Sequence, residues 1–581
     1  MGREVGHEAE TAAGHAASMK KLLTACGLAA LSLAATAAAA SPPPRPKLIL
    51  AISVDQFSSE LFRRYRSSYT AGLKTLAGGI AYPVGYQSHA ATETCPGHST
   101  ILTGRHPAAT GIIANSWYDR KRGSEVYCVS VPGGDAKRRG PAQMKVTTLG
   151  DWIKAANPVA RSFAVAGKDR AAITMAGKHA DGVYWWTDGV GFVTSSDAGP
   201  ANARRTASAD RFSANLLLGW KTRPPLLWPA PSAECAVLVK RRQFGELTVS
   251  GEVPPDMARG VTAAEGFVTA KPFNEALRAS PLFDSTIADF AIDLIQREQL
   301  GKRAGTDLLA VGLSATDYVG HRLGNGGAEM CVQQAELDRT IGRLIAAVQA
   351  QKVPFVVMLT ADHGATDASE RVFDQGGQAI RIEDRYLMMR LNSAMKERFG
   401  ATRPLLETSD SQQLYVLGDT QTPDPAAVAA AAVTWLKAQP EVWQVYTRAD
   451  VEGAPVPPGT PPDQLSMVQR MRESYDPERS GDIFIVYAER SSFGTPVKLG
   501  DTVAGHGSPW DHDRQVPILF WWPGAASESR DQPVETVDIA PTLASLVRIK
   551  PGPSSMAAAW TWAATVRADH QPGISPVIRP I

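Results

Sequence analysis

The sequence predicts an α/β fold with a mainly parallel central sheet flanked by helices. Residues 47–54 form a continuous apolar run of strand length, as is typical of a parallel strand buried on both faces. Similar runs lie at 308–312, 353–359, 483–487 and 516–522. Helical stretches lie between some of these runs, most clearly 328–351, where apolar residues keep helical spacing. Strands that alternate with helices favour a parallel sheet.

Residues 1–40 are predicted to be an upstream extension and a secretory signal peptide. Met19 and two lysines precede an apolar, Ala-rich stretch that ends in four alanines before Ser41. Residues 1–18 resemble an upstream mis-start. An uncleaved membrane anchor is the alternative, but the apolar stretch barely reaches bilayer length. Lipidation at Cys26 is disfavoured because too little apolar sequence precedes it. We therefore expect a periplasmic or secreted protein without stable membrane association.

Residues 41–581 are expected to form a single catalytic domain. The chain of 581 residues is 44% apolar, so it has the composition to build a large core. Its formal net charge of +2 gives no indication of nucleic acid as a partner. The intervals at about 185–280 and 370–480 are rich in Pro, Gly and Trp and contain no cluster of candidate ligands. We interpret these two intervals as insertions that cap the core and shape the substrate pocket.

Metal-ligand residues lie at or near the ends of several strand-like runs. The candidate ligands are Asp55, Asp317, His321, Asp362, His363 and His506. The carboxyl ends of parallel strands are where such sheets bind ligands. Asp317 and His321 are four residues apart and therefore share one side of a helical turn. Gly364 is expected to permit a sharp turn after His363. Six oxygen and nitrogen ligands suit two adjacent zinc ions.

Thr94 is the candidate nucleophile. It stands just before an expected helix with Pro96 in the first turn, where free backbone amides favour an anionic phosphate. An isolated Thr in this position is more simply a helix cap. Together with six metal ligands, however, a hydroxyl that zinc can activate favours phosphoryl transfer. Cys95 is expected to be structural, because no activating His is recognisable beside it.

The segment that begins at Thr94 also resembles a known family. Thr-Cys-Pro-Gly-His-Ser-Thr-Ile-Leu-Thr-Gly-Arg-His-Pro at 94–107 is similar to the alkaline phosphatase superfamily. It is most similar to exported bacterial alkaline phosphatases with a Thr nucleophile, which are related to type I phosphodiesterase/nucleotide pyrophosphatases. The resemblance extends over roughly residues 48–546. The chain departs from the family mainly after about residue 550.

The resemblance implies a role for each site residue. One zinc ion would be held by Asp317, His321 and His506, and the other by Asp55, Asp362, His363 and Thr94. Asn115, Lys168 and Arg170 match the family's residues that contact non-bridging phosphate oxygens. Lys168 and Arg170 bring two positive charges, which suit the extra negative charge of a monoester dianion.

We therefore predict a zinc-dependent phosphate monoester hydrolase that acts on small-molecule phosphate esters through a phosphothreonine intermediate. A phosphodiesterase or nucleotide pyrophosphatase on the same scaffold is the alternative. A sulfatase is disfavoured because its Cys-x-Pro-x-Arg motif is missing: Cys95 is followed directly by Pro96. An inactive, exported phosphate-binding protein would normally have lost a ligand or the nucleophile, and none is missing here.

Four cysteines remain after the proposed signal cleavage: Cys95, Cys128, Cys235 and Cys331. Disulfides persist in exported proteins, but the sequence leaves all three pairings open. His98, His106 and His512 lie near the motifs, and we expect them to make structural hydrogen bonds rather than to bind metal. The natural substrate and the oligomeric state stay open.

Overall fold

The computed structural model describes residues 45–133, 137–195, 200–261, 271–410, 412–417 and 423–552. All of them belong to one compact unit, 43–560. The expected signal peptide and the divergent tail after residue 552 lie outside the described residues. Within the described ranges, no helix has both the length and the apolar character that a membrane span requires.

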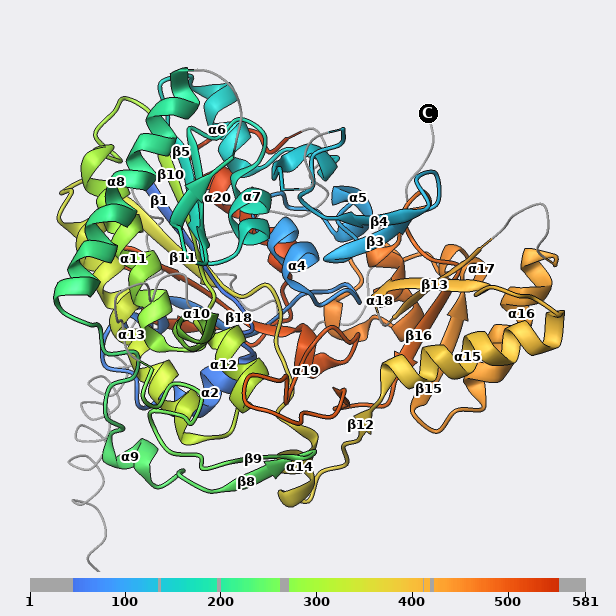
Figure 1. The fold of residues 1–581 in the computed structure, drawn as a ribbon. Coiled ribbons are helices and arrows are strands. Elements are labelled where there is room, and N and C mark those ends of the chain that lie inside the picture. Colours follow the sequence, from blue (N-terminus) through green and yellow to red (C-terminus); the bar gives the residue numbers. More distant parts are fainter. Residues whose placement is uncertain are drawn as a thin grey trace, which may run out of the picture. The chain divides into compact units, whose positions relative to one another are not determined.

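The described part of the chain is organised around a nine-stranded sheet (Figure 1). In spatial order the strands are β19 (Glu528–Ser529), β2 (Ile80–Tyr86), β18 (Gln515–Trp521), β11 (Phe355–Thr360), β1 (Leu48–Val54), β10 (Asp307–Leu313), β5 (Ser162–Ala166), β6 (Gly182–Thr187) and β7 (Gly191–Thr194). The strands from β11 to β6 are parallel, whereas β18 and β7 are antiparallel to their neighbours. The predicted α/β fold with a mainly parallel central sheet is confirmed.

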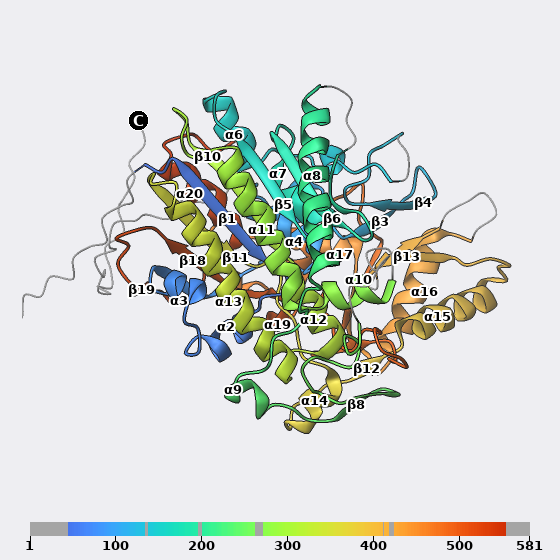
Figure 2. The same ribbon diagram turned by 60° about the vertical axis from the view of Figure 1, so that its left-hand side comes forward.

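Helices cover both faces of this sheet (Figures 1 and 2). One face carries α2 (Ser59–Tyr65), α3 (Gly72–Ala77), α8 (Pro200–Thr222), α11 (Pro281–Arg297) and α13 (Ala328–Gln349). The opposite face carries α4 (Thr94–Ile101), α6 (Leu149–Ala156), α7 (Asp169–Ala176) and α20 (Ile539–Leu546). Every residue of β1 and β10 is buried, because both faces of these strands are covered. This burial explains their unbroken apolar sequences.

A second, antiparallel sheet is built from the carboxy-terminal half of the chain. Its order is β13 (Leu406–Asp410), β14 (Gln413–Val416), β16 (Ile483–Tyr487) and β15 (Val442–Thr447). It packs with α15 (Asp384–Phe399), α16 (Pro425–Lys437), α17 (Arg448–Glu452) and α18 (Met467–Ser474). The run at 483–487, expected beside the parallel strands, therefore belongs to this other sheet. Its apolar sequence indicates that the strand is buried, but burial alone does not determine which strands it pairs with.

The interval 185–280 begins inside the central sheet rather than as an insertion, because it contains half of β6 and all of β7. The later part of this interval holds α9 (Ala233–Ala236), β8 (Arg242–Phe244), β9 (Leu247–Val249) and α10 (Lys271–Arg278). The remaining elements are α5 (Pro107–Thr110), β3 (Ser116–Asp119), β4 (Ser124–Tyr127), α12 (Ala315–Leu323), α14 (Ser369–Asp374), β12 (Arg381–Ile382), β17 (Ser492–Phe493), α19 (Asp511–Arg514) and the short 3-10 helices Pro141–Gln143, Pro462–Gln464 and Thr536–Asp538.

Candidate active site

Helix α4 places Thr94 at the carboxyl edge of the central sheet. The helix begins at Thr94, with Glu93 as its extended N-cap residue, and Thr94 is buried. A Cβ atom at Gly97 would lie 2.0 Å from the carbonyl oxygen of Asp362. Glycine at this position therefore lets the helix approach the end of β11 closely. Thr94 is thereby brought next to the candidate ligands.

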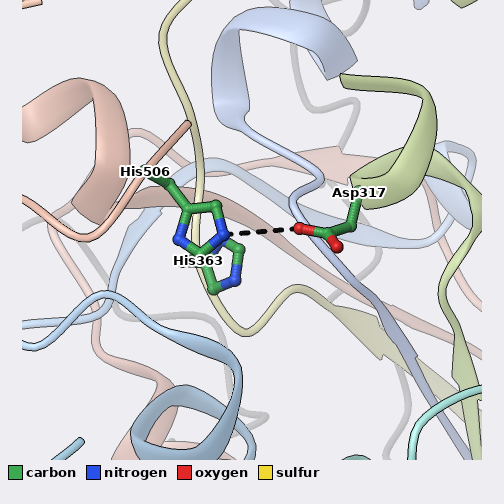
Figure 3. A group of neighbouring side chains, drawn as sticks. All are labelled: Asp317, His363 and His506. Carbon is green, nitrogen blue, oxygen red and sulfur yellow. Dashed lines mark ion pairs between the residues drawn. The ribbon is translucent and has the colours of Figure 1, made fainter. Parts of the chain in front are cut away.

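The six candidate metal ligands come together from four parts of the chain. Asp55 follows β1, Asp362 and His363 follow β11, and Asp317 and His321 lie on α12, while His506 lies on the loop before α19. Figure 3 shows Asp317, His363 and His506 converging. Two groups have ligand atoms within 4.8 Å of one another: Asp317, His363 and His506, and Asp55, Asp362 and His363. His363 is common to both groups. His321, which was expected in the first, has its Nε2 3.2 Å from Asp317 Oδ1.

Hydrogen bonds orient the three candidate histidine ligands. Each Nδ1 lies 2.8–2.9 Å from a backbone carbonyl oxygen: Ala504 for His321, Gly364 for His363 and Thr92 for His506. An Nδ1–H that donates to a carbonyl leaves Nε2 with a lone pair. Burial lowers the pKa of His363 to about 3, so this imidazole is neutral. With Nδ1 held in this way, the Nε2 atom of each histidine faces a carboxylate of the site.

The spacing of these atoms tests whether a metal would fit. Imidazole Nε2 and carboxylate oxygen atoms face one another at 3.2 Å for His321 and Asp317, and at 3.4 Å for His506 and Asp317. His363 Nε2 lies 3.5 Å from Asp55 Oδ1 and 3.3 Å from Asp362 Oδ2. Two ligands of one tetrahedral zinc ion, each bonded at about 2.0–2.1 Å, would stand about 3.3–3.5 Å apart. The donor set and its spacing therefore fit zinc.

The charges of the site also favour bound metal ions. Asp55, Asp317 and Asp362 are all buried, and their carboxylate oxygens face Lys168 and the candidate histidine ligands at 2.5–3.5 Å. Burial, and then the charges of Asp317 and Asp362, raise the pKa of Asp55 well above its usual value. A buried group of carboxylates is costly unless cations compensate it. Bound divalent cations would supply that compensation.

Lys168 and Arg170 both reach the Thr94 hydroxyl. Lys168 Nζ lies 3.4 Å and Arg170 Nη2 3.3 Å from Thr94 Oγ1. Lys168 Nζ also lies 2.6 Å from Asp55 Oδ2 and 2.5 Å from Asp317 Oδ2. Burial alone would lower the pKa of the Lys168 ammonium, but these two carboxylates raise it overall. Lys168 therefore stays charged beside the hydroxyl.

Asn115, the third residue expected to bind substrate, also borders α4. Its side-chain Oδ1 accepts a hydrogen bond of 2.9 Å from the backbone N–H of Cys95. The structure thus brings all the sequence-predicted site residues to one place.

Gln56 and His98 also support the site, and sequence reasoning gave no role to Gln56. The Gln56 N–H donates to Asp362 Oδ1 at 3.1 Å, and the backbone of Gln56 has a φ of 65°, a region that non-glycine residues rarely adopt. His98 Nδ1 lies 2.9 Å from Asp362 Oδ2, which agrees with the structural role expected for His98. The position of Gln56 directly after Asp55 was the one available signal.

Gly364 acts differently from the expectation. Its backbone φ is not in the left-handed region, so a special turn does not require glycine. A Cβ atom there would instead lie 2.3 Å from the carbonyl oxygen of His512. Close packing against α19, rather than turn geometry, explains this residue.

The four cysteines, whose pairing the sequence left open, form two disulfides. Cys95 bonds to Cys128, and Cys235 bonds to Cys331. The first disulfide lies directly beside Thr94. The second joins α9 to α13, and Cys331 packs in the core cluster on that side of the central sheet.

Comparisons with known proteins place this geometry in a family. The model of the type I phosphodiesterase / nucleotide pyrophosphatase family matches residues 49–509. The chain is 40% identical to alkaline phosphatase PhoK of a Sphingomonas species, over 87% of this chain and 89% of PhoK. It is also 40% identical to alkaline phosphatase PhoD of Zymomonas mobilis, over 87% of this chain and 85% of PhoD. The crystal structure of alkaline phosphatase PafA has the same fold, with a TM-score of 0.74 at 24% identity over 88% of this chain and 97% of PafA.

Proposed function

The chain belongs to the type I phosphodiesterase / nucleotide pyrophosphatase family, within which it is an alkaline phosphatase, and we propose that it uses two zinc ions and Thr94 as its nucleophile. The observation that carries this proposal is the convergence of Lys168 Nζ and Arg170 Nη2 on Thr94 Oγ1, beside six candidate metal-ligand side chains. Asp317, His321 and His506 would hold one ion. Asp55, Asp362, His363 and Thr94 would hold the other.

Zinc, when bound, would act as a Lewis acid that lowers the pKa of the Thr94 hydroxyl and offsets phosphate charge. Thr94 Oγ1 gives up its proton to solvent and attacks phosphorus in line, and the ester oxygen leaves with its electron pair and takes up a proton, which releases the alcohol. The product of this step is a phosphothreonine. Water then attacks the phosphothreonine, releases inorganic phosphate and returns a proton to Thr94.

The other residues of the site bind and orient the phosphate. Lys168 and Arg170 donate charge-assisted hydrogen bonds to non-bridging oxygens, and the planar Arg170 fork suits two oxygens at once. Asn115 adds a neutral donor, and the free amides at the start of α4 favour a negative charge there. Three donor side chains fit the exposed oxygens of a monoester better than those of a diester. The proposed substrates are therefore small phosphate monoesters.

We also propose that residues 1–40 direct export and are cleaved near Ser41, which would make the enzyme periplasmic or secreted. The two disulfides support this location, since disulfides persist in oxidising compartments. Sequencing the amino terminus of the mature protein tests the cleavage site.

The reaction is tested by assaying zinc-loaded enzyme on a phosphate monoester and a diester with the same leaving group. Faster turnover of the monoester supports the proposal. Faster turnover of the diester would instead assign the chain to the phosphodiesterases of its family.

A further inference from the structure

Asn115 makes three hydrogen bonds, all to residues close to Thr94. Two of the partners flank Thr94 in the sequence, and the third is joined by a disulfide to one of those two. The Asn115 N–H donates to Glu93 Oε2 at 2.7 Å. The Asn115 carbonyl oxygen accepts from the Cys128 N–H at 3.0 Å. The Asn115 side-chain Oδ1 accepts from the Cys95 N–H at 2.9 Å. Glu93 and Cys95 flank Thr94, and Cys128 is the disulfide partner of Cys95.

These contacts determine which end of the Asn115 amide is which. The Cys95 N–H can only donate, so the atom that faces it must be the carbonyl oxygen. The reversed amide would place an N–H group against an N–H group. The Nδ2 group, with its two N–H bonds, is therefore turned away from Cys95. Asn115 is thus oriented as a hydrogen-bond donor, which is the role that phosphate binding requires of it.

The Cys95–Cys128 disulfide joins the two chain segments that make this arrangement. Cys95 is on the first turn of α4, and Cys128 follows β4, the strand that pairs with β3 directly after Asn115. Both cysteines are fully buried in an apolar cluster that includes Ile113 and Trp117. Loss of the disulfide would free the β3–β4 hairpin to move relative to α4. The backbone and the side chain of Asn115 are anchored to opposite ends of this covalent link.

We propose that Glu93 and the Cys95–Cys128 disulfide act as a clamp that positions the Asn115 amide against the Thr94 nucleophile. This inference rests on the proposed function, because it concerns how the enzyme binds its phosphate group. Cys95, Cys128 and Glu93 are positioning residues that act through Asn115. A displacement of about 1 Å in such a group can lower the rate by as much as about a hundredfold.

The test compares Cys95→Ala/Cys128→Ala with the matched control Cys235→Ala/Cys331→Ala, since each double variant removes one buried disulfide. Loss of the clamp should lower kcat/KM for a monoester at least about tenfold and weaken competitive inhibition by inorganic phosphate. The control should retain both values. Equal losses in the two variants would show a general effect on the fold and would overturn the clamp.

A second comparison separates positioning from folding. In an Asn115→Ala background, removing the Cys95–Cys128 disulfide should change kcat/KM by less than about twofold, because the clamped residue is already gone. A tenfold loss in that background would refute an action through Asn115.

Glu93 gives a test that needs no change in the disulfides. Glu93→Gln keeps an acceptor for the Asn115 N–H and should remain within about threefold of wild type, whereas Glu93→Ala should lose phosphate affinity. Identical behaviour of the two variants would overturn the role of Glu93. Phosphate trapped on Thr94 in the wild type tests the proposed function separately, so the clamp can fail while that function stands.

Discussion

The Thr94 hydroxyl lies between two cationic side chains and a group of metal-ligand atoms. A threonine hydroxyl is a weak nucleophile at neutral pH, so it must be activated to react. Lys168, Arg170 and the amino terminus of α4 all favour a negative charge at Thr94 Oγ1. The same groups favour the phosphate that the hydroxyl would attack. Activation and substrate binding are therefore properties of one small set of contacts.

Replacing Thr94 with Ala should abolish the phosphorylated intermediate and reduce kcat by a factor of about 1,000 or more. Thr94→Ser keeps a hydroxyl and is the matched control, which should still form a phosphoenzyme. Acid quenching of enzyme incubated with labelled monoester, followed by peptide mapping, measures the intermediate. Label on another residue of the wild type would show that Thr94 is not the nucleophile.

Lys168 and Arg170 should determine the preference for monoesters. Each charge-assisted hydrogen bond is worth roughly 1.5–3 kcal/mol, so changing both residues to Ala should slow monoester hydrolysis about a hundredfold or more. Diester hydrolysis should fall much less, because the second ester group already occupies one contact position. The ratio of the two kcat/KM values measures the effect. Equal losses on both substrates would mean that these residues bind phosphate without distinguishing the esters.

The sequence predicted the site better than it predicted the arrangement of elements. Motif residues such as Asp317 and His321 could be placed because their spacing on a helix is fixed by local geometry. Strand pairing is not local: the run at 483–487 is as apolar as β1 but pairs with β14 and β15. The contacts that position Asn115 could not be predicted either. They depend on the Cys95–Cys128 disulfide, and the sequence left three pairings of the four cysteines open. The sequence therefore predicted the local motifs of the site, but it predicted neither the strand pairing nor the disulfide pairing.

Helix α12, which carries Asp317 and His321, is tied to α11 by a buried carboxyl group. Asp284 Oδ1 accepts from the Ala315 N–H at 2.8 Å, and Asp284 Oδ2 accepts from Gln333 Nε2 at 3.0 Å. This contact satisfies an amide at the start of α12 that has no partner within the helix. Burial nevertheless raises the pKa of Asp284 to about 7. The element that presents two candidate ligands is therefore held by a group that titrates near neutral pH.

This raised pKa has a predictable effect on stability. The unfolded chain loses the Asp284 proton near pH 4, whereas the folded chain keeps it until about pH 7. The folded state therefore binds more protons in this window, and the free energy of unfolding falls as the pH rises from about 4 to 7. The slope is at most about 1.4 kcal/mol per pH unit.

Asp284→Asn should remove this dependence, since an amide does not ionise and its Nδ2 can donate to the unpartnered Gln333 Oε1 after that side chain turns over. The stability difference between wild type and variant, measured by urea unfolding at several pH values, should change by up to roughly 4 kcal/mol between pH 4 and 7. Asp289→Asn on the same helix is the control, because the Asp289 side chain is only half-buried and pairs with Arg343. A difference that stays constant with pH would contradict the assignment to Asp284.

At the scale of the whole described unit, the site gathers residues from positions as far apart as 55 and 506. The chain has a net charge of only +2, yet three carboxylates are buried together at the carboxyl edge of the central sheet. Burial first, and then the charges of the neighbouring carboxylates, raise the pKa of Asp55, so keeping Asp55 charged in this cluster opposes folding. The fold therefore tolerates an unfavourable cluster where β1, β11 and α12 meet.

Removing the metals should weaken the whole unit as well as stop catalysis. A ligand that binds only the folded state stabilises it by about 4 kcal/mol when its free concentration is about 1,000 times its Kd. Chelation should therefore lower the Tm measured by calorimetry and abolish monoester hydrolysis, and added zinc should restore both. Magnesium should restore them poorly, because it prefers octahedral oxygen sites over sites that are rich in imidazole.

The control is the double variant Asp55→Asn/Asp317→Asn, which removes two buried charges and one ligand from each proposed zinc site. Its Tm should therefore respond little to chelator or zinc, which separates binding at this site from metal effects elsewhere. Full activity with an unchanged Tm in metal-free enzyme would refute the zinc assignment, since the three buried carboxylates would then need no metal ion.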